Sequence, residues 1–325
     1  MLNRKKPSSR QPKREPWTVD TLLRERALAL SNSVDVSSDQ TYGSALNSWI
    51  AFIQMHHFPL EPNPDTLSFF VVYMSHHIRP KSVKSYLSGL VQQLEPDFPS
   101  IREVRASRLV VKVMKGCMKM RGQAVRRKLP LSLPDLLFIS KRFSSSKSHD
   151  DLLWTTLVIT GFHGLLRLGE MTFPDNVYIR DWRKVTKRSS LIVRPHQYEF
   201  HLPAHKADRF FEGNRVLISA FSSSFDPCPI FLRYLSSRDF LFPASSPLWL
   251  TSKGRIPTRS FFITRLRRFL PKTFAGASMR AGGATHLATL HTPPDIIRAL
   301  GRWTSEAWEV YICVHPALLH SLLHR

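Results

Sequence analysis

The sequence predicts a mainly α-helical protein with a small β-sheet, in which an all-helical N-terminal domain precedes a mixed α/β domain. Three observations carry this prediction. Apolar residues recur at helical spacing through 17–125. Short alternating stretches typical of strands are confined to the middle of 126–325. A basic stretch that ends in proline, Arg126–Pro130, separates the two regions, and a chain of 325 residues has room for about two domains.

The N-terminal region begins with a basic arm and continues as amphipathic helices. Residues 1–16 are polar, basic and proline-containing, which predicts disorder; the arm could serve nuclear import, contact DNA, or only keep the chain soluble. Asp65 is expected to cap a helix over Thr66–His77. Two apolar stripes predict core-facing helices: Tyr42, Ala45, Leu46, Trp49, Ile50 and Ile53, and then Val83, Leu87, Leu90, Val91 and Leu94.

The last helix of this region, expected over Ile101–Lys128, carries an unusual number of cations. Glu103 is the one acidic residue in this range, so the positive charges are not balanced within the helix. A charge run is often only a solvated face, but this one favours contact with phosphates. The candidate DNA-binding residues are Arg102, Arg105, Arg108, Lys112, Lys115, Lys119 and Arg121.

The C-terminal region opens with a helix and then mixes helices with strands. Ser132 and Asp135 have the spacing of a capping box. A loop over Ser144–Ser148 precedes an apolar helix, Leu152–Ile159. Short strands are expected at Ser190–Val193, Glu199–Leu202 and Val216–Ser219, and helices at Pro227–Leu235 and Ser260–Leu270.

Bulk composition narrows the class of partner. The formal charge of +23 and a pI near 10.6 indicate a polyanionic partner, although ribosomal or histone-like proteins would share this property. Cys117, Cys228 and Cys313 have no paired spacing, so we expect no metal site, no disulfide framework and a reduced, intracellular protein. No apolar run of 18 residues occurs, and the N-terminus lacks the apolar core of a secretory signal, so no membrane association is expected.

Several chemistry-bearing residues occur in a suggestive order. Arg167 is followed three residues later by Glu170, and Lys206 lies between two expected strands. Arg280 then stands in S-M-R-A-G-G-A-T, Arg302 and Trp303 in L-G-R-W, and Tyr311 follows Arg280 by 31 positions. Guanidiniums grip phosphate oxygens with paired N–H groups and stay charged at any working pH. A tyrosine hydroxyl can be a nucleophile that forms a covalent phosphotyrosine.

This order resembles the signature of the tyrosine recombinases (integrases), and its wording is most similar to the crypton-type recombinases of fungal genomes. The resemblance covers 161–311 and implies a tyrosine-recombinase catalytic domain over 126–325. It also implies that residues 17–125 form the helical, SAM-like core-binding domain of this family. By resemblance, Arg167, Lys206, Arg280 and Arg302 act on the phosphate, Lys206 protonates the departing 5′ oxygen, and Tyr311 is the nucleophile. Glu170 and Trp303 would support them.

Two features of the resemblance leave alternatives open. The second family box usually reads His-x-x-Arg, but Ala277 stands three residues before Arg280 and cannot move protons. The chain is therefore either a recombinase without this histidine or an impaired or inactive DNA-binding relative; a type IB topoisomerase is a weaker third option. Arg302 occupies the position where the family has a His or Trp, and Trp303 is its neighbour, so either could face the phosphate.

The resemblance implies the remaining expectations. The protein would cleave and rejoin double-stranded DNA through a 3′-phosphotyrosyl intermediate, without metal or other cofactor. It would be encoded by or derived from a mobile element, act in the nucleus and assemble as a homo-oligomer, dimer to tetramer, on DNA. The leucines of Pro316–Arg325 could pack on their own domain or on a neighbouring protomer.

Overall fold

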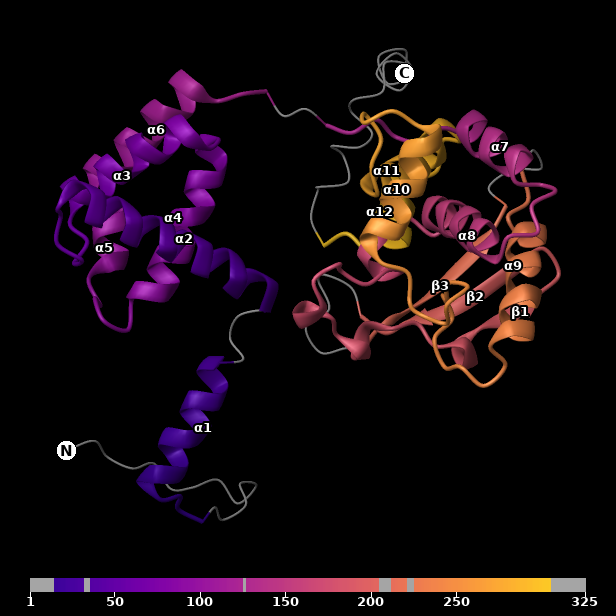
Figure 1. Cartoon of the computed structure of the whole chain (residues 1–325), viewed down its shortest axis with the longest axis horizontal. Coiled ribbons are helices and arrows are strands. Elements are labelled where there is room, and N and C mark those ends of the chain that lie inside the picture. Colours follow the sequence, from indigo (N-terminus) through magenta and orange to yellow (C-terminus); the bar gives the residue numbers. More distant parts are fainter. Residues whose placement is uncertain (1–14, 32–35, 125–126, 205–211, 221–224, 305–325) are drawn as a thin grey trace. The chain divides into compact units, whose positions relative to one another are not determined.

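The described residues form helices and one small sheet, as expected, and the chain divides into two compact units, Met1–Val125 and Arg126–Arg325 (Figure 1). The computed structural model describes residues 15–31, 36–124, 127–204, 212–220 and 225–304. Each unit has its own hydrophobic core, one centred on Trp49 and Phe70 and the other on Trp154 and Phe162.

The described part of the first unit is wholly helical. Both predicted stripes contribute to its core: Ala45, Trp49 and Ile53 of α2 (Val36–His56) are buried, and so are all five apolar residues predicted on α4 (Pro80–Leu94). Three aromatic rings, Trp49, Phe52 and Phe70, pack against one another with centroids 5.3–5.9 Å apart. The helices are α1 (Val19–Ser31), α2 (Val36–His56), α3 (Pro64–His77), α4 (Pro80–Leu94), α5 (Ile101–Ala106) and α6 (Arg108–Arg121).

The expected start of α3 was wrong by two residues. Asn63, not Asp65, is the N-cap: its side chain accepts a hydrogen bond from the Thr66 amide at 2.9 Å, and Pro64 occupies the first turn. Proline suits this position because its missing N–H would have no partner there. Asp65 instead lies inside the first turn, where its negative charge faces the positive end of the helix dipole.

The single helix expected over Ile101–Lys128 was also wrong. The chain breaks at Ser107, whose extended backbone ends α5 and whose hydroxyl accepts from the Val110 amide at the start of α6. Helix α6 stops at Arg121, and Gly122 follows it in an extended conformation. Serine competes with helical hydrogen bonding in this way because its short hydroxyl reaches nearby amides.

In the second unit, α7 (Leu133–Arg142) and α8 (His149–His163) precede the sheet. The predicted capping box is confirmed: the Asp135 amide donates to the Ser132 hydroxyl, and the Ser132 amide donates to the Asp135 carboxylate at 2.8 Å. Helix α8 is buried on all sides, and Trp154 donates its indole N–H to the Phe262 carbonyl at 3.1 Å. A uniformly apolar helix of this kind forms the centre of a domain rather than one side of it.

The three predicted strands form one antiparallel sheet, shifted by up to two residues from their expected ends. The strands β1 (Ile192–Arg194), β2 (Gln197–Leu202) and β3 (Asn214–Ser219) pair in the order β1-β2-β3, with Phe200 opposite Val216. Along β2 the alternate residues Tyr198, Phe200 and Leu202 face the core. The Tyr198 ring stacks on Phe231 with the ring centroids 3.8 Å apart, which fixes this face of the sheet against α9 (Cys228–Leu241).

Short turns of 3₁₀-helix and four further helices make up the rest of the described part of this unit. The expected helices at Pro227–Leu235 and Ser260–Leu270 are found, and the first continues as far as Leu241. The 3₁₀ turns are η1 (Leu168–Glu170), η2 (Val177–Ile179), η3 (Trp182–Lys184) and η4 (Arg188–Ser190). The helices are α9 (Cys228–Leu241), α10 (Arg259–Phe269), α11 (Ala277–Thr289) and α12 (Pro294–Gly301).

The glycine pair of α11 allows two backbones to approach closely. A Cβ at Gly282 would lie 2.1 Å from the Leu131 carbonyl oxygen, and one at Gly283 would lie 2.1 Å from the Phe162 carbonyl oxygen. Real Cβ atoms do not come this close to backbone oxygens. The missing side chain of Gly283 therefore lets α11 lie this near to the C-terminal end of α8, and that of Gly282 lets it lie this near to the segment before α7.

We therefore expect Gly283→Ala to lower the free energy of unfolding by about 1–3 kcal/mol, because α11 must move away from α8. Urea denaturation measures this change. The matched control is Gly169→Ala in the same unit, where an added Cβ meets no atom within 4 Å and a change within about 0.5 kcal/mol is expected. Equal effects of the two substitutions would show that the close approach is not what the glycine pair provides.

Candidate active site

The C-terminal end of α8 turns sharply just before Arg167. The Leu166 amide donates to the Gly161 carbonyl at 2.9 Å and the Leu165 amide to the Phe162 carbonyl at 3.3 Å, the two bonds of a Schellman motif. Leu165 occupies the left-handed position of this motif, with φ +48°, although glycine is the usual residue there. The turn buries the Leu165 side chain beside α11 and α12, in a small apolar cluster with Ala284, Leu287, Ile297 and Trp303.

Arg167 and Glu170 are held together by η1, as the spacing indicates. The Arg167 guanidinium donates to one oxygen of the Glu170 carboxylate at 2.9 Å, and the Arg167 amide donates to the other at 2.8 Å. The Glu170 side chain is only 6% exposed, whereas that of Arg167 is 32% exposed. The carboxylate therefore fixes the arginine while leaving its outer edge accessible to solvent.

Arg280 lies on α11 and is 3% exposed. Its guanidinium donates to the Leu165 carbonyl at 2.9 Å and to the Gly301 carbonyl. The Trp303 ring covers the guanidinium carbon at 4.1 Å. Arg280 thus joins the end of α8 to the end of α12, and its charge is buried against an aromatic face, an arrangement that favours a cation.

Arg302 follows α12 in a left-handed conformation, with φ +55°. This backbone turns its side chain back toward α8, where the guanidinium donates to the carbonyls of Gly164 at 3.2 Å and Leu165 at 3.1 Å. The same nitrogen lies 3.7 Å from the Glu170 carboxylate. Burial lowers the pKa of Arg302 from its ordinary value; Glu170 opposes this shift and the positive charge of Arg167 adds to it.

These contacts form one cluster of three guanidiniums and one carboxylate at the junction of α8, α11 and α12. Arg280 and Arg302 donate to the same oxygen, that of Leu165, and Arg167 and Arg302 share Glu170. Three cations facing one buried anion leave a positive potential where water is largely excluded, so the cluster would attract an oxyanion more strongly than exposed arginines would. Of the two neighbours, Arg302 enters the cluster and Trp303 stacks on Arg280.

Two predicted site residues, Lys206 and Tyr311, lie outside the described residues, and so do His205 and His315. Ala277 is the first residue of α11 and is exposed. Two described histidines, His163 and His286, lie on the helices that meet at the cluster, and both rings contact Phe162. Burial lowers the pKa of His163 to about 4, and its ring nitrogen donates to the Ile159 carbonyl. Burial also lowers the pKa of His286 from its ordinary value.

The residues that motif reasoning missed are backbone groups. The Leu165 carbonyl accepts hydrogen bonds from two of the three guanidiniums, and the apolar leucine side chain gives no sign of this role in the sequence. Gly164 is the one available signal, because a glycine after an apolar helix indicates where that helix ends and its carbonyls become free.

In the first unit, α6 carries four exposed cations on one face. Arg108, Lys112, Lys115 and Lys119 are spaced four, three and four residues apart, which places them along one side of a helix. None of the four makes an ion pair with a described residue. The other predicted DNA-binding residues have partners: Arg102 forms a two-point pair with Glu95, Arg105 donates to Ser88, and Arg121 contacts His76.

Two further properties concern the described residues alone. No group of three or more His, Cys, Asp or Glu side chains in them is placed to hold a metal ion. No helix in the same part of the chain combines the length and apolar character needed to cross a membrane.

Comparison with known proteins gives structural similarity only. No protein-family model matches the sequence, and no curated protein is significantly similar to it. The fold is similar to a lambda integrase dimer bound to a COC′ core site, with a TM-score of 0.55 and 12% identity over 90% of this chain and 94% of that one. It is also similar to the integrase of transposon Tn1549 in complex with circular intermediate DNA (TM-score 0.52, 14% identity, 82% and 87% covered).

A third similar structure is the XerH site-specific recombinase bound to a palindromic difH substrate in a post-cleavage complex. Its TM-score is 0.52 at 13% identity, over 81% of this chain and 69% of that one. The chain therefore has the fold of the tyrosine recombinases.

The buried carboxylate at the centre of the cluster gives a stability prediction. Glu170→Gln should lower the free energy of unfolding by about 2–4 kcal/mol, because it leaves the buried guanidinium of Arg302 without a counter-charge. Glu199→Gln is the matched control, since Glu199 also contacts two arginines, Arg194 and Arg215, but both are about half exposed. Surface pairs of this kind contribute about 0–1 kcal/mol. If denaturation gives similar losses for both variants, the cluster is not buried in solution as described.

Proposed function

We propose that this chain is a site-specific DNA recombinase or integrase that cleaves and rejoins strands through a 3′-phosphotyrosyl link to Tyr311. The observation that supports this most strongly is the arginine cluster: Arg167, Arg280 and Arg302 are far apart in sequence, yet their guanidiniums meet at one junction. They do so within a fold shared with integrases and recombinases whose structures were solved on DNA.

The chemistry follows from the charges. In the proposed reaction the Tyr311 hydroxyl loses its proton to water and its oxygen attacks phosphorus, the bond to the 5′ oxygen breaks, and Lys206 gives that oxygen a proton. The negative charge that grows on the non-bridging oxygens is stabilised by Arg167, whose outer edge is accessible, and by Arg302. Arg280 is buried, so it contributes its positive charge without contacting the phosphate directly. Glu170 holds Arg167 and Arg302 in place. Religation is the same step in reverse, so it needs neither metal nor ATP.

Activation of the tyrosine is the demanding part. A phenol with a pKa near 10 is ionised in about one molecule in a thousand at pH 7, a cost of roughly 4 kcal/mol. The usual histidine is replaced by Ala277, so the field of the three guanidiniums must supply most of this stabilisation. Each helps by favouring the phenolate over the phenol.

A second candidate function is DNA binding without cleavage. Ala277 favours it, and so does Arg280, because a guanidinium that is 3% exposed and bonded to two carbonyls serves the fold whether or not it touches a phosphate. Such a protein would keep the cationic face of α6 and lack a productive tyrosine.

Several finer statements belong to the same proposal. The sequence of the motif around Arg280, S-M-R-A-G-G-A-T, favours a crypton-type recombinase, which would come from a mobile element and act in the nucleus. Exchange between two DNA sites requires several protomers, so we propose that the chain assembles on double-stranded DNA as a dimer to tetramer. No cofactor is needed for the reaction as written.

The first test is covalent capture. Bound sequences are selected from a randomised duplex library, and a nicked suicide version of the selected duplex is then incubated with the full chain. The proposal expects an adduct that survives denaturation and is absent in Tyr311→Phe, because removal of the hydroxyl removes the nucleophile. Tyr178→Phe is the control, since Tyr178 is exposed and outside the cluster. A wild-type chain that binds the duplex and never forms the adduct would establish the second candidate instead.

The second test concerns α6. Replacing Lys112, Lys115 and Lys119 by Gln should weaken binding to duplex DNA of any sequence. It should also reduce the slope of log affinity against log salt by about 0.9 for each phosphate that the lysines no longer neutralise. The charge-matched control is the triple substitution of Lys187, Lys253 and Lys272, exposed residues of the second unit. Unequal weakening between sequences would mean that these lysines read bases rather than phosphates.

A further inference from the structure

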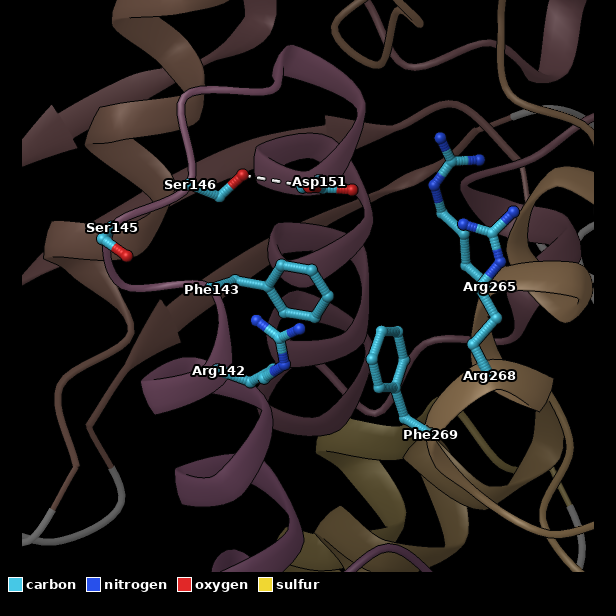
Figure 2. Close-up of a pocket in the computed structure, with 8 residues that line it drawn as sticks. All are labelled: Arg142, Phe143, Ser145, Ser146, Asp151, Arg265, Arg268 and Phe269. Atoms are coloured by element: carbon cyan, nitrogen blue, oxygen red, sulfur yellow. Dashed lines mark hydrogen bonds between the residues drawn. The ribbon is translucent and has the colours of Figure 1, made fainter.

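A second group of arginines surrounds a pocket at the N-terminal end of α8, away from the active-site cluster. The pocket has a volume of about 340 Å³ and lies between α7, the loop before α8, and α10. Helix α8 has 15 residues, and at 1.5 Å per residue it separates this pocket from the Arg167 turn by about 20 Å. The lining residues are Arg142, Phe143, Ser145, Ser146, Asp151, Arg265, Arg268 and Phe269 (Figure 2).

Arg265 is held rigidly in the pocket wall. Its guanidinium lies over the Phe261 ring at 4.1 Å and donates to the Asp150 carboxylate at 3.3 Å. Asp150 is itself shared, because it also accepts from the Ser252 amide at 2.7 Å. The Nε atom of Arg265 is buried and meets no hydrogen-bond acceptor among the described residues. Burial of this charge is therefore only partly compensated, and a nearby anion would stabilise it further.

Arg142 and Arg268 form no ion pair with a described residue. Arg142 comes from the end of α7, with its guanidinium 5.9 Å from the centre of the Phe143 ring, and Arg268 comes from α10, where its side chain lies beside that of Arg265 (Figure 2). Asp151 is the one acid that lines the pocket, and it accepts a hydrogen bond from the Ser146 hydroxyl at 3.0 Å. With Asp150 and Asp151 set against three arginines, the pocket keeps a net positive charge.

The floor of the pocket is stiff. The rings of Phe143 and Phe269 meet edge to face at 5.1 Å, and each lies 5.7 Å from the buried ring of Trp154. An aromatic cluster of this kind fixes the ends of α7 and α10 from which the arginines project. The guanidiniums are therefore presented from opposite sides of a preformed hollow, and a ligand that bridges them need not order the backbone first.

We propose that this pocket is a binding site for a phosphate group, distinct from the active-site cluster and independent of the proposed recombinase activity. Arginine forks match the oxygens of phosphate with paired N–H bonds, and Ser145 adds an exposed hydroxyl. The volume is at the lower end of the roughly 300–1,000 Å³ range of small-ligand sites, which suits a phosphate or a small phosphate monoester. The same group could come from a free phosphate or nucleotide, or from the DNA backbone.

The test measures binding of inorganic phosphate, of a 5′-mononucleotide and of a short DNA duplex to the full chain by titration calorimetry. The pocket variant is Arg142→Gln with Arg268→Gln. The charge-matched control is Arg255→Gln with Arg259→Gln, exposed residues outside the pocket. We expect at least a tenfold loss of phosphate affinity in the pocket variant and less than a twofold change in the control. Arg167→Gln, which alters the active-site cluster, should leave phosphate binding at the pocket unchanged.

The arms distinguish the source of the phosphate. Loss of phosphate and nucleotide binding with duplex affinity equal to that of the control assigns the pocket to a small soluble ligand. Loss of duplex affinity beyond that of the control, with a smaller salt slope, assigns it to the DNA backbone. Should the pocket variant fail to fold by circular dichroism, Arg268→Gln alone is used, with at least a threefold loss expected. Equal phosphate affinity in the wild type and the pocket variants, or an equal fall in pocket variant and control, overturns the proposal.

Discussion

The second unit depends on one backbone oxygen, the carbonyl of Leu165, to which two arginines donate. For it to point at α11 and α12, Leu165 must adopt a left-handed conformation, which costs a non-glycine residue about 1–2 kcal/mol. Burial of its side chain in the small cluster around Trp303 offsets that cost. The bonds from Arg280 and Arg302 then connect the ends of helices that lie more than a hundred positions apart in the sequence.

Bringing two guanidiniums to one oxygen also brings two positive charges together, and they repel strongly where water is excluded. Glu170 is the compensation available in the described chain. It contacts Arg167 and lies near Arg302, but it supplies one negative charge against three positive ones. The fold therefore maintains an excess of positive charge at this junction that is only partly neutralised. An oxyanion would complete the balance, which is the property that a phosphate-transfer site requires before the substrate arrives.

The sequence predicts the parts of this arrangement that depend on local rules. The capping box of Ser132 and Asp135, the stripes of α2 and α4, and the Arg167–Glu170 pair each involve residues within a few positions of one another, and each is found. The cap at Asn63 was missed because Asn63 and Asp65 are both residues that can cap a helix. The break at Ser107 was missed because the apolar and basic pattern continues across it, and only the hydroxyl of Ser107, which accepts from the Val110 amide, starts a new helix there. The burial of Arg280 was missed for another reason: its acceptors are the carbonyls of Leu165 and Gly301, and side-chain patterns do not show which carbonyls end unpaired.

The chain has two kinds of cation, exposed ones on α6 and buried ones in the arginine cluster. The exposed cations suit affinity for DNA in general, and the buried cations suit chemistry at one phosphate. Four cations of α6, Arg108, Lys112, Lys115 and Lys119, are exposed and form no ion pair with a described residue. Salt therefore screens them over about 10 Å at 0.1 M, and they suit reversible contact with many phosphates. Arg280 and Arg302 are buried and bonded to carbonyls, so screening hardly reaches them, and their position rather than their number determines what they do. A net charge of +23 would by itself predict only attraction to polyanions. Under the proposed function, the burial of two arginines at considerable cost in desolvation would distinguish a site for one particular phosphate from a surface for any of them.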